Sequence, residues 1–167
     1  MLPGLEHLIM QCAPMVAPST MAAIVQVESR GNPLALNVNG SRGLTRQPAS
    51  RAEAKAWAQW LVEHGYNIDM GLAQVNVRHL QRMGVSIGDA FDPCINLRMG
   101  AKILVENYQN ASHAYGSGQQ ALLAAISAYN TGNHKSGFQN GYVSKVEAAN
   151  RSSSKPPPVG TGPISVR

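Results

Sequence analysis

Residues 18–29 read PSTMAAIVQVES and decide the fold, because they describe a helix with almost no polar side. Pro18 suits the first position of a helix, and Gly31 follows its end. One face repeats at the i, i+3, i+4 and i+7 spacing of a helix, through Met21, Ile24, Val25 and Glu28. We therefore predict a buried helix that carries one carboxyl group, that of Glu28, on an apolar face.

Helical patterns continue on the C-terminal side of this segment. Further helices are expected at 50–64, at 76–83, from Pro93 to Tyr108 or beyond, at 117–129 and at 139–149. Capping residues mark several of the starts, namely Ser50 with Glu53, Asn76, Asp92, and Ser117 with Gln120. The exception is LNVNGSRGL at 36–44, where Asn39-Gly40 between short alternating segments is a hairpin signal. The pattern predicts a mostly α domain with a small β or irregular patch near 35–46.

The length of 167 residues suits one domain. From residue 151 the chain reads RSSSKPPPVGTGPISVR and has no apolar face, so we expect a domain over 1–150 and a disordered tail over 151–167. The net charge is +5, but no run of Lys and Arg appears, so nucleic-acid binding is not expected. Residues 1–25 are interrupted by Glu6 and three prolines, which fits neither a signal peptide nor a transmembrane segment. The export route stays open.

The sequence contains no established metal or cofactor motif. CxxC, HExxH, GxSxG, GxGxxG and the P-loop pattern are all absent from the chain, so no metal and no cofactor are expected. The two cysteines, Cys12 and Cys94, lie far apart. They form one disulfide in an oxidising compartment or remain two buried thiols, and both alternatives stay open at this point.

Glu28 is the most unusual polar residue of the chain. Burying a charged carboxylate is costly, so such a group either takes a raised pKa or finds a specific partner. A carboxylic acid that keeps its proton near neutral pH suits general-acid cleavage of a glycosidic bond. The alternatives are an ion pair with Arg30 or a solvated position at the helix end.

The other acidic residues offer no obvious second catalytic acid. Most of the nine have a capping position or a polar helix face, which leaves Glu28 and Asp69. Asp69 stands just before Gly71, where an aspartate is expected to serve a turn by bonding nearby amides. A mechanism with one acid is therefore simpler than the paired carboxylates of most glycosidases.

Three motifs follow one another in a recognisable order: ES at 28–29, GLAQVN at 71–76 and SAYNTG at 127–132. Together they resemble the lytic transglycosylase family, which shares its fold with goose-type lysozyme, over about residues 5–147. The fold expected from the resemblance is a lysozyme-like helical domain. FDPCINLRMGAKIL at 91–104, together with QCAP at 11–14, is similar to the specialised lytic transglycosylases of type IV secretion systems.

The resemblance implies a reaction on peptidoglycan glycan strands. Glu28 would protonate the glycosidic oxygen between N-acetylmuramic acid and N-acetylglucosamine. The N-acetyl group of the substrate would stabilise the positive charge that develops at the anomeric carbon. The same residue would then take a proton from the C6 hydroxyl, which closes a 1,6-anhydro ring. Ser29 is expected beside the acid and Gln74 in the groove. Tyr129 is expected to hydrogen-bond to Glu28, and Asn130 to shape the same corner as a helix cap.

The resemblance also implies a setting. It places the chain in the periplasm, with type IV secretion components as partners, and there Cys12 and Cys94 should be disulfide-bonded. Ala73 departs from the Met or Gly usual in the family, which leaves that substrate contact open. Two other outcomes also stay open: a lysozyme-type hydrolase that activates water, and a non-catalytic glycan-binding subunit.

Overall fold

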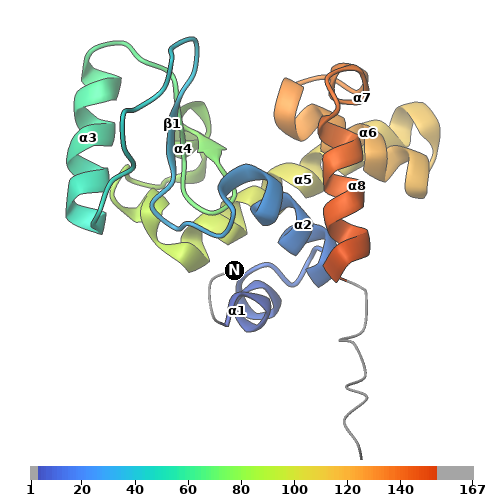
Figure 1. Cartoon of the computed structure of the whole chain (residues 1–167). Helices are drawn as coiled ribbons and strands as arrows, with labels where there is room; N and C mark the ends of the chain where they lie inside the picture. Colours follow the sequence, from blue (N-terminus) through green and yellow to red (C-terminus); the bar gives the residue numbers. More distant parts are fainter. Residues whose placement is uncertain (1–3, 154–167) are drawn as a thin grey trace, which may run out of the picture.

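Two helices, α2 (Pro18–Ser29) and α5 (Pro93–Tyr115), lie at the centre of the computed structural model, which describes residues 4–153 (Figure 1). The short helix α1 (Leu5–Cys12) packs against both. The helix α6 (Gln119–Thr131) packs along α5, and α8 (Tyr142–Ser153) packs along α2. A single turn, α7 (Ser136–Gln139), joins α6 to α8. These helices form one side of the molecule.

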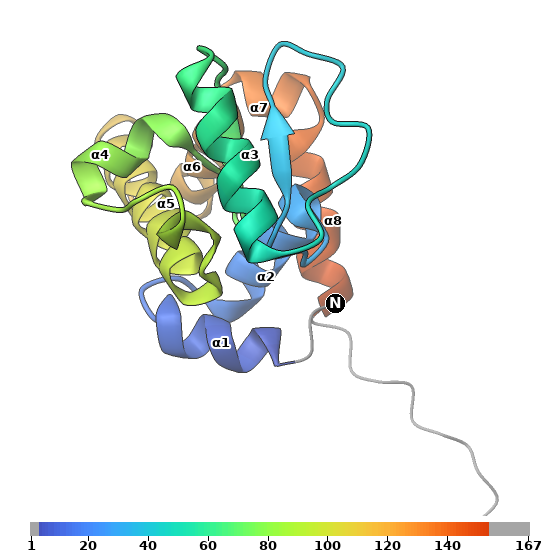
Figure 2. The same ribbon diagram turned by 90° about the vertical axis from the view of Figure 1, so that its left-hand side faces the viewer.

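The other side is built around a small antiparallel sheet (Figures 1 and 2). Its strands are β1 (Leu36–Val38), β2 (Ile68–Met70) and β3 (Val75–Asn76), in that spatial order. The helix α3 (Arg51–Glu63) stands beside the long loop that leaves β1 (Figure 2). The 3₁₀ turn η1 (Val77–His79) leads into α4 (Leu80–Met83), and a second turn, η2 (Asp89–Phe91), precedes α5.

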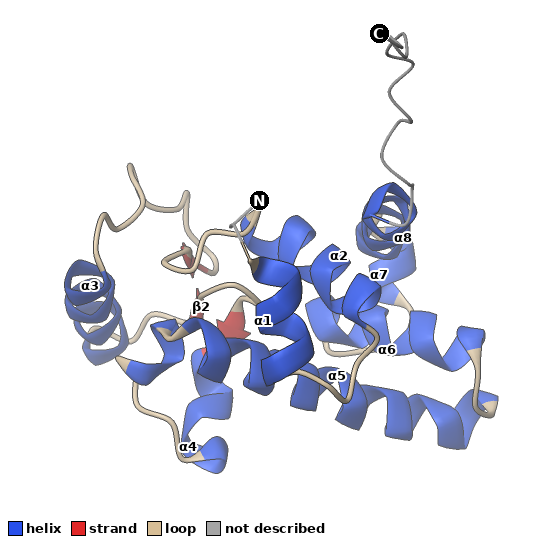
Figure 3. Cartoon of the chain, turned by 90° about the horizontal axis from the view of Figure 1, so that it is seen from below, coloured by secondary structure: helices blue, strands red, loops and turns tan. Residues whose placement is uncertain are grey.

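The core joins the two sides through side chains that are fully withdrawn from water. Its largest members come from α1, α2, the sheet, the loop after β2, η2, α5 and α8: Ile9, Met21, Ile24, Val25, Leu36, Ile68, Met70, Leu72, Val75, Phe91, Leu97 and Val143. Removing this apolar surface from water is the main favourable contribution to folding. The predicted buried helix at 18–29 is therefore confirmed, as is the mostly α fold with a small β patch (Figure 3).

Three of the predicted helix starts are confirmed by their caps. The Ser50 hydroxyl accepts from the Glu53 amide, the Asp92 carboxylate from Ile95, and the Asn76 side chain from Arg78. The capping box predicted at Ser117 is wrong, because Gly118 precedes α6 and makes no side-chain cap. The last helix begins at Tyr142 rather than at 139, since α7 and the turn at Gly141 occupy the intervening residues.

The hairpin predicted at 36–44 does not form. The strand β1 pairs with β2, so Leu36 lies opposite Met70 and Val38 opposite Ile68. The reason lies in burial: Ile68 and Met70 are fully buried on the partner strand, whereas Ser41 and Arg42 are exposed and offer no apolar face. The Asn39-Gly40 turn instead begins the loop that leads to α3.

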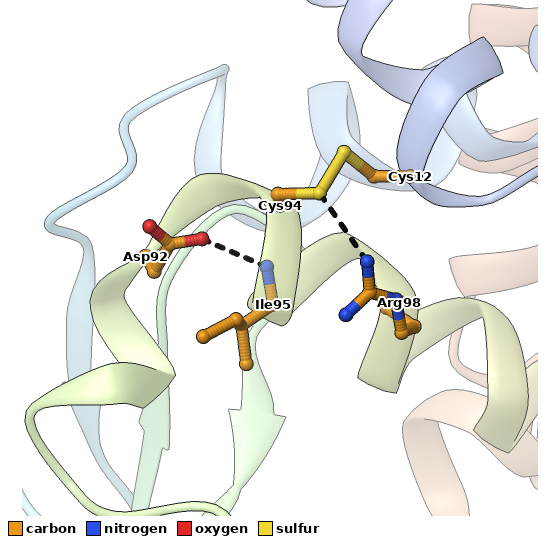
Figure 4. The surroundings of a disulfide bond; sticks show 5 residues. All are labelled: Cys12, Asp92, Cys94, Ile95 and Arg98. Atoms are coloured by element: carbon orange, nitrogen blue, oxygen red, sulfur yellow. Dashed lines mark hydrogen bonds between the residues drawn. A yellow bond between two sulfur atoms is a disulfide. The ribbon is translucent and has the colours of Figure 1, made fainter.

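A disulfide joins Cys12 at the end of α1 to Cys94 in the first turn of α5 (Figure 4). Of the two alternatives left open for the cysteines, the structure shows the disulfide and not two buried thiols. The bridge spans 82 residues of sequence and fixes α1 beneath the two central helices. Arg98, one helical turn further, places its Nη2 3.7 Å from the Cys94 sulfur (Figure 4).

The end of the domain differs slightly from the boundary predicted at residue 150, because α8 continues to Ser153. The rest of the predicted tail lies outside the described residues. Within 4–153, every helix is too short or too polar to cross a membrane.

Candidate active site

Glu28 lies in the last turn of α2 and is half-buried. Burial raises the pKa of Glu28 to about 7, with a hydrogen bond from Tyr142 opposing the rise and the charge of Asp69 adding to it. Arg30, the expected alternative partner, caps α2 and forms no ion pair with Glu28 in the described part of the chain. Glu28 can therefore hold a proton near neutral pH and release it within the same pH range.

The tyrosine bound to this carboxyl is Tyr142, which the sequence did not single out. Its hydroxyl donates a 2.6 Å hydrogen bond to Oε1 of Glu28 from the first residue of α8. Burial and the neighbouring Glu28 raise the pKa of Tyr142, so the phenol stays protonated and remains a donor. An aromatic residue at a helix start reads as ordinary core in the sequence, and only the packing of α8 on α2 reveals its role.

Tyr129, the tyrosine expected to bind Glu28, is placed differently. Its hydroxyl has one hydrogen and donates it to the carbonyl oxygen of Ala73 at 2.6 Å. Gly100 of α5 makes this approach possible, because a Cβ there would lie 2.9 Å from the Tyr129 hydroxyl oxygen. Tyr129 still lines the same hollow as Glu28, so its direct effect is to hold the loop that carries Ala73.

A second residue missed in the sequence, Asn96, anchors that loop from below. It is fully buried in α5, and its Nδ2 donates to the carbonyls of Met70 (2.7 Å) and Ala90 (2.9 Å). Its Oδ1 accepts from the amide of Ala73 at 2.7 Å. A buried side chain whose polar atoms are all bonded in this way fixes the backbone around it. The signal available in the sequence was the same as for Glu28, a polar residue within a buried helix.

Gln74 lies on this loop with a positive φ of 48°, and its side chain turns back toward β1. Its Nε2 donates to the carbonyls of Ala35 (3.1 Å) and Gly71 (3.0 Å). No hydrogen bond within residues 4–153 uses its Oε1, and Gln74 lines the cleft described below. Its contact with a substrate in the groove stays a prediction.

Ser29 follows the acid directly but is buried, and its hydroxyl bonds to the protein itself. It donates to the carbonyl of Leu72 at 2.7 Å and accepts from the amide of Gly31 at 3.2 Å. These bonds tie the end of α2 to the 71–76 loop. The geometry gives Ser29 a role in positioning the loop next to Glu28.

Asp69 is not the turn residue expected from the sequence. It lies in β2, where its two carboxylate oxygens accept from Nδ2 of Asn39 (3.0 Å) and Nδ2 of Asn76 (2.7 Å). Its bonds to amides are as expected, but the amides belong to side chains on the neighbouring strand and turn. The structure therefore brings a second carboxyl group into the cleft with Glu28.

Asn130 lies in the final turn of α6 and is exposed at the cleft. Its Oδ1 accepts from Nδ2 of Asn140 at 2.9 Å. The predicted cap role is wrong, because Gly132, with a φ of 80°, caps this helix. Asn130 and Glu28 line the same two hollows, and a role of Asn130 in binding substrate stays a prediction.

The cleft consists of two adjoining hollows of about 240 and 460 Å³. Five residues line both of them: Glu28, Asn39, Asp69, Gln74 and Asn130. The walls come from the end of α2, from the sheet side and from the α6 side of the molecule, and more than half of the lining residues carry amide, carboxyl or guanidinium groups. Such a lining offers many hydrogen-bond donors and acceptors to a polar ligand, as a carbohydrate requires. Within the described residues, no group of His, Cys, Asp and Glu is arranged to hold a metal ion.

Residues 8–152 match the family model described as the transglycosylase SLT domain, and the chain belongs to this family. The family expected from the three motifs is thereby confirmed. The chain is 49% identical to the type IV secretion system protein virB1 of Brucella suis biovar 1 (strain 1330) over 155 residues, which cover 89% of this chain and 65% of that protein. It is 43% identical over 139 residues to the protein virB1 of Agrobacterium fabrum (strain C58), covering 83% of this chain and 56% of that one. The chain thus spans less than two thirds of these relatives. No solved structure matches it.

Proposed function

We propose that the protein is a peptidoglycan lytic transglycosylase with Glu28 as its only proton-transferring residue. The observation that carries this proposal is the pKa of Glu28, raised by burial to about 7 in a polar cleft of a transglycosylase-family domain. A group with this pKa gives up and recovers a proton with little free-energy cost near neutral pH, as a residue that acts twice must do.

The reaction runs in two steps in this proposal. Protonated Glu28 donates to the glycosidic oxygen between N-acetylmuramic acid and N-acetylglucosamine, and the bond to the anomeric carbon of the muramic acid breaks. The N-acetyl group of the substrate stabilises the positive charge that develops there. The carboxylate of Glu28, held by the Tyr142 hydroxyl, then takes the proton of the C6 hydroxyl, whose oxygen closes the 1,6-anhydro ring.

The names of the relatives and the paired cysteines support a proposal for the setting in which the protein acts. Because similar proteins are named as type IV secretion system proteins, we place this protein's activity in local opening of the cell wall for such a machine. The Cys12–Cys94 disulfide supports a periplasmic location, since disulfides persist in oxidising compartments. Secretion components and glycan strands are the proposed partners.

The test compares wild type with Glu28→Gln, which keeps the size of the side chain and removes its proton chemistry. Wild type is expected to clear a suspension of purified peptidoglycan, and the variant is expected to be at least a hundredfold slower, in line with the usual contribution of a general acid, about 10²–10⁴-fold. Equal clearing by both proteins would refute the catalytic role of Glu28. Binding of both proteins without clearing by either would indicate the glycan-binding subunit instead.

One observation favours a second candidate, a lysozyme-type hydrolase. Asp69 lines the same cleft as Glu28 and has both carboxylate oxygens oriented by amides. A second carboxylate in this position is suited to activating a water molecule. The two candidates differ in product, because hydrolysis leaves a reducing end and transglycosylation leaves a 1,6-anhydro end.

A further inference from the structure

Two arginines stand on the walls of the cleft without an acidic partner. Arg78 lines the 240 Å³ hollow, and Arg30 lines the 460 Å³ hollow. Both are exposed, and neither forms an ion pair within residues 4–153. Glu28 is one of the five residues that line both hollows, so each arginine shares a hollow with the proposed catalytic acid. Each of the two hollows thus has one unpaired arginine in its wall.

Several arginines outside the cleft form ion pairs, whereas Arg42 and Arg98 are exposed and form none within residues 4–153. Arg46 lies 2.6 Å from Glu53, and Arg82 lies 3.0 Å from Glu106. Arg51 lies 3.6 Å from Asp89 and equally close to Asp92. What distinguishes Arg78 and Arg30 is that they are unpaired and line the cleft that contains Glu28.

Arg78 has its planar end free for a ligand. The one hydrogen bond of its side chain within the described residues uses Nε, which lies 3.4 Å from Nε2 of His79. Burial lowers the pKa of His79, and the charges of Arg82 and Arg78 lower it further. This favours the neutral imidazole, which accepts the bond from Arg78 in the tautomer that leaves Nε2 unprotonated. The two terminal nitrogens of Arg78 remain for a planar anion, and a guanidinium group binds a carboxylate with two parallel hydrogen bonds.

The cleft otherwise disfavours anions, because it contains the carboxyl groups of Glu28 and Asp69. Peptidoglycan strands carry a lactyl group on every second sugar, which ends in a carboxylate or in a stem peptide with carboxylates of its own. An uncharged amino-sugar polymer such as chitin lacks these groups. The unpaired arginines therefore add a feature that favours an anionic glycan, because a carboxylate forms a charge-assisted pair with a guanidinium group and a neutral sugar oxygen does not.

We propose that Arg78 and Arg30, one in each hollow of the cleft, bind carboxylates carried by the glycan strand. The two arginines would thereby select peptidoglycan over uncharged glycans. This proposal rests on the proposed function, since it takes the glycan strand as the ligand. The shared chemistry is a carboxylate on a muramic acid unit. Its two sources, the lactyl group itself and the stem peptide, are separated by the choice of ligand.

The experiment measures binding in a Glu28→Gln background, where cleavage is expected to be at least a hundredfold slower. Three soluble ligands of similar length are compared by calorimetry: strands with stem peptides, strands whose peptides an amidase has removed to leave free lactyl carboxylates, and chitin oligosaccharides. Arg78→Gln and Arg30→Gln are each expected to weaken binding of the acidic strands by about threefold to tenfold and to leave chitin binding unchanged. Loss confined to the first ligand assigns the carboxylate to the stem peptide, and loss on the second assigns it to the lactyl group.

Two control variants sharpen the result. Arg51→Gln removes the same charge from α3, outside both hollows, and is expected to bind all three ligands as the parent does. Arg78→Lys keeps the charge and is expected to recover part of the lost affinity. Two outcomes would overturn this inference and leave the proposed function standing. One is an equal loss of affinity for chitin, and the other is no loss of affinity for either acidic ligand while the parent still binds it. Failure of the Glu28→Gln parent to bind any of the glycans would overturn the proposed function with it.

Discussion

The hydroxyl of Tyr142 and the carboxyl of Glu28 meet at 2.6 Å although 114 residues of sequence separate them. The bond joins the first turn of α8 to the last turn of α2. It stabilises the carboxylate form of Glu28, whereas burial stabilises the protonated form, and the pKa settles at about 7. The pH dependence of activity should therefore respond to changes on either side of this balance.

Tyr142→Phe removes the bond that favours the carboxylate, so the pKa of Glu28 should rise further. Because the acid must be protonated to begin the reaction, activity of wild type should fall as the pH rises through about 7. In Tyr142→Phe this alkaline limb should move up by about half a unit to one unit, with a rate at the optimum about tenfold lower. A pH profile of kcat for both proteins measures the two effects.

Tyr129→Phe is the matched control for this profile. It removes the same atom from a neighbouring tyrosine whose hydroxyl bonds to Ala73 rather than to Glu28. Its alkaline limb should stay where that of wild type lies. A shift in Tyr129→Phe with none in Tyr142→Phe would show that the assignment of the two tyrosines is wrong.

Asp69→Asn should move the same limb in the opposite direction. The charge of Asp69 raises the pKa of Glu28, so its removal should lower that pKa and bring the alkaline limb down by a fraction of a unit. Asparagine keeps the shape of the side chain beside Asn39 and Asn76. An upward shift would contradict the electrostatic role assigned to Asp69.

Asn96→Ala should destabilise the domain by about 2–4 kcal/mol, because it leaves three buried backbone groups without their partner. Urea unfolding followed by circular dichroism measures the change. Asn37→Ala, an exposed position on β1, should cost less than about 0.5 kcal/mol in the same assay. Similar losses for the two variants would mean that Asn96 does not hold the 71–76 loop.

Reduction of the Cys12–Cys94 disulfide should lower the free energy of unfolding by about 2–5 kcal/mol, because the bridge closes a long loop in the unfolded chain. Thermal unfolding with and without a reductant provides the measurement. A chain carrying both Cys12→Ser and Cys94→Ser should melt at one temperature under either condition. An unchanged melting temperature of wild type on reduction would show that the bridge contributes little.

The helices were predictable where local chemistry determines them. An apolar face at helical spacing, as in 18–29, or a cap such as Asp92 before Pro93, acts between residues a few positions apart. The strand pairing was not predictable in this way. The strand β1 pairs with β2 and not with the nearer segment at 41–44, because the rest of the core buries Ile68 and Met70 of β2.

The site residues divide in the same way into those visible in the local sequence and those that depend on tertiary packing. Glu28 stood out because a carboxyl group on an apolar face is an anomaly visible in one helix. Tyr142 carries no such anomaly, since a tyrosine at a helix start is ordinary until α8 is packed on α2. Asp69 was interpreted as a turn residue because the sheet pairing was not visible in the sequence. That pairing places Asp69 opposite Asn76, and it brings Asn39 to Asp69 from 30 residues away.

The central claim is that Glu28 acts alone and that the C6 hydroxyl of the substrate, not water, attacks the anomeric carbon. Digestion of purified peptidoglycan in ¹⁸O-labelled water, followed by mass spectrometry of the new sugar ends, tests it most directly. We predict 1,6-anhydro ends without the label, formed by wild type and absent from Glu28→Gln. Reducing ends that carry ¹⁸O at the anomeric position would contradict the account and identify a hydrolase.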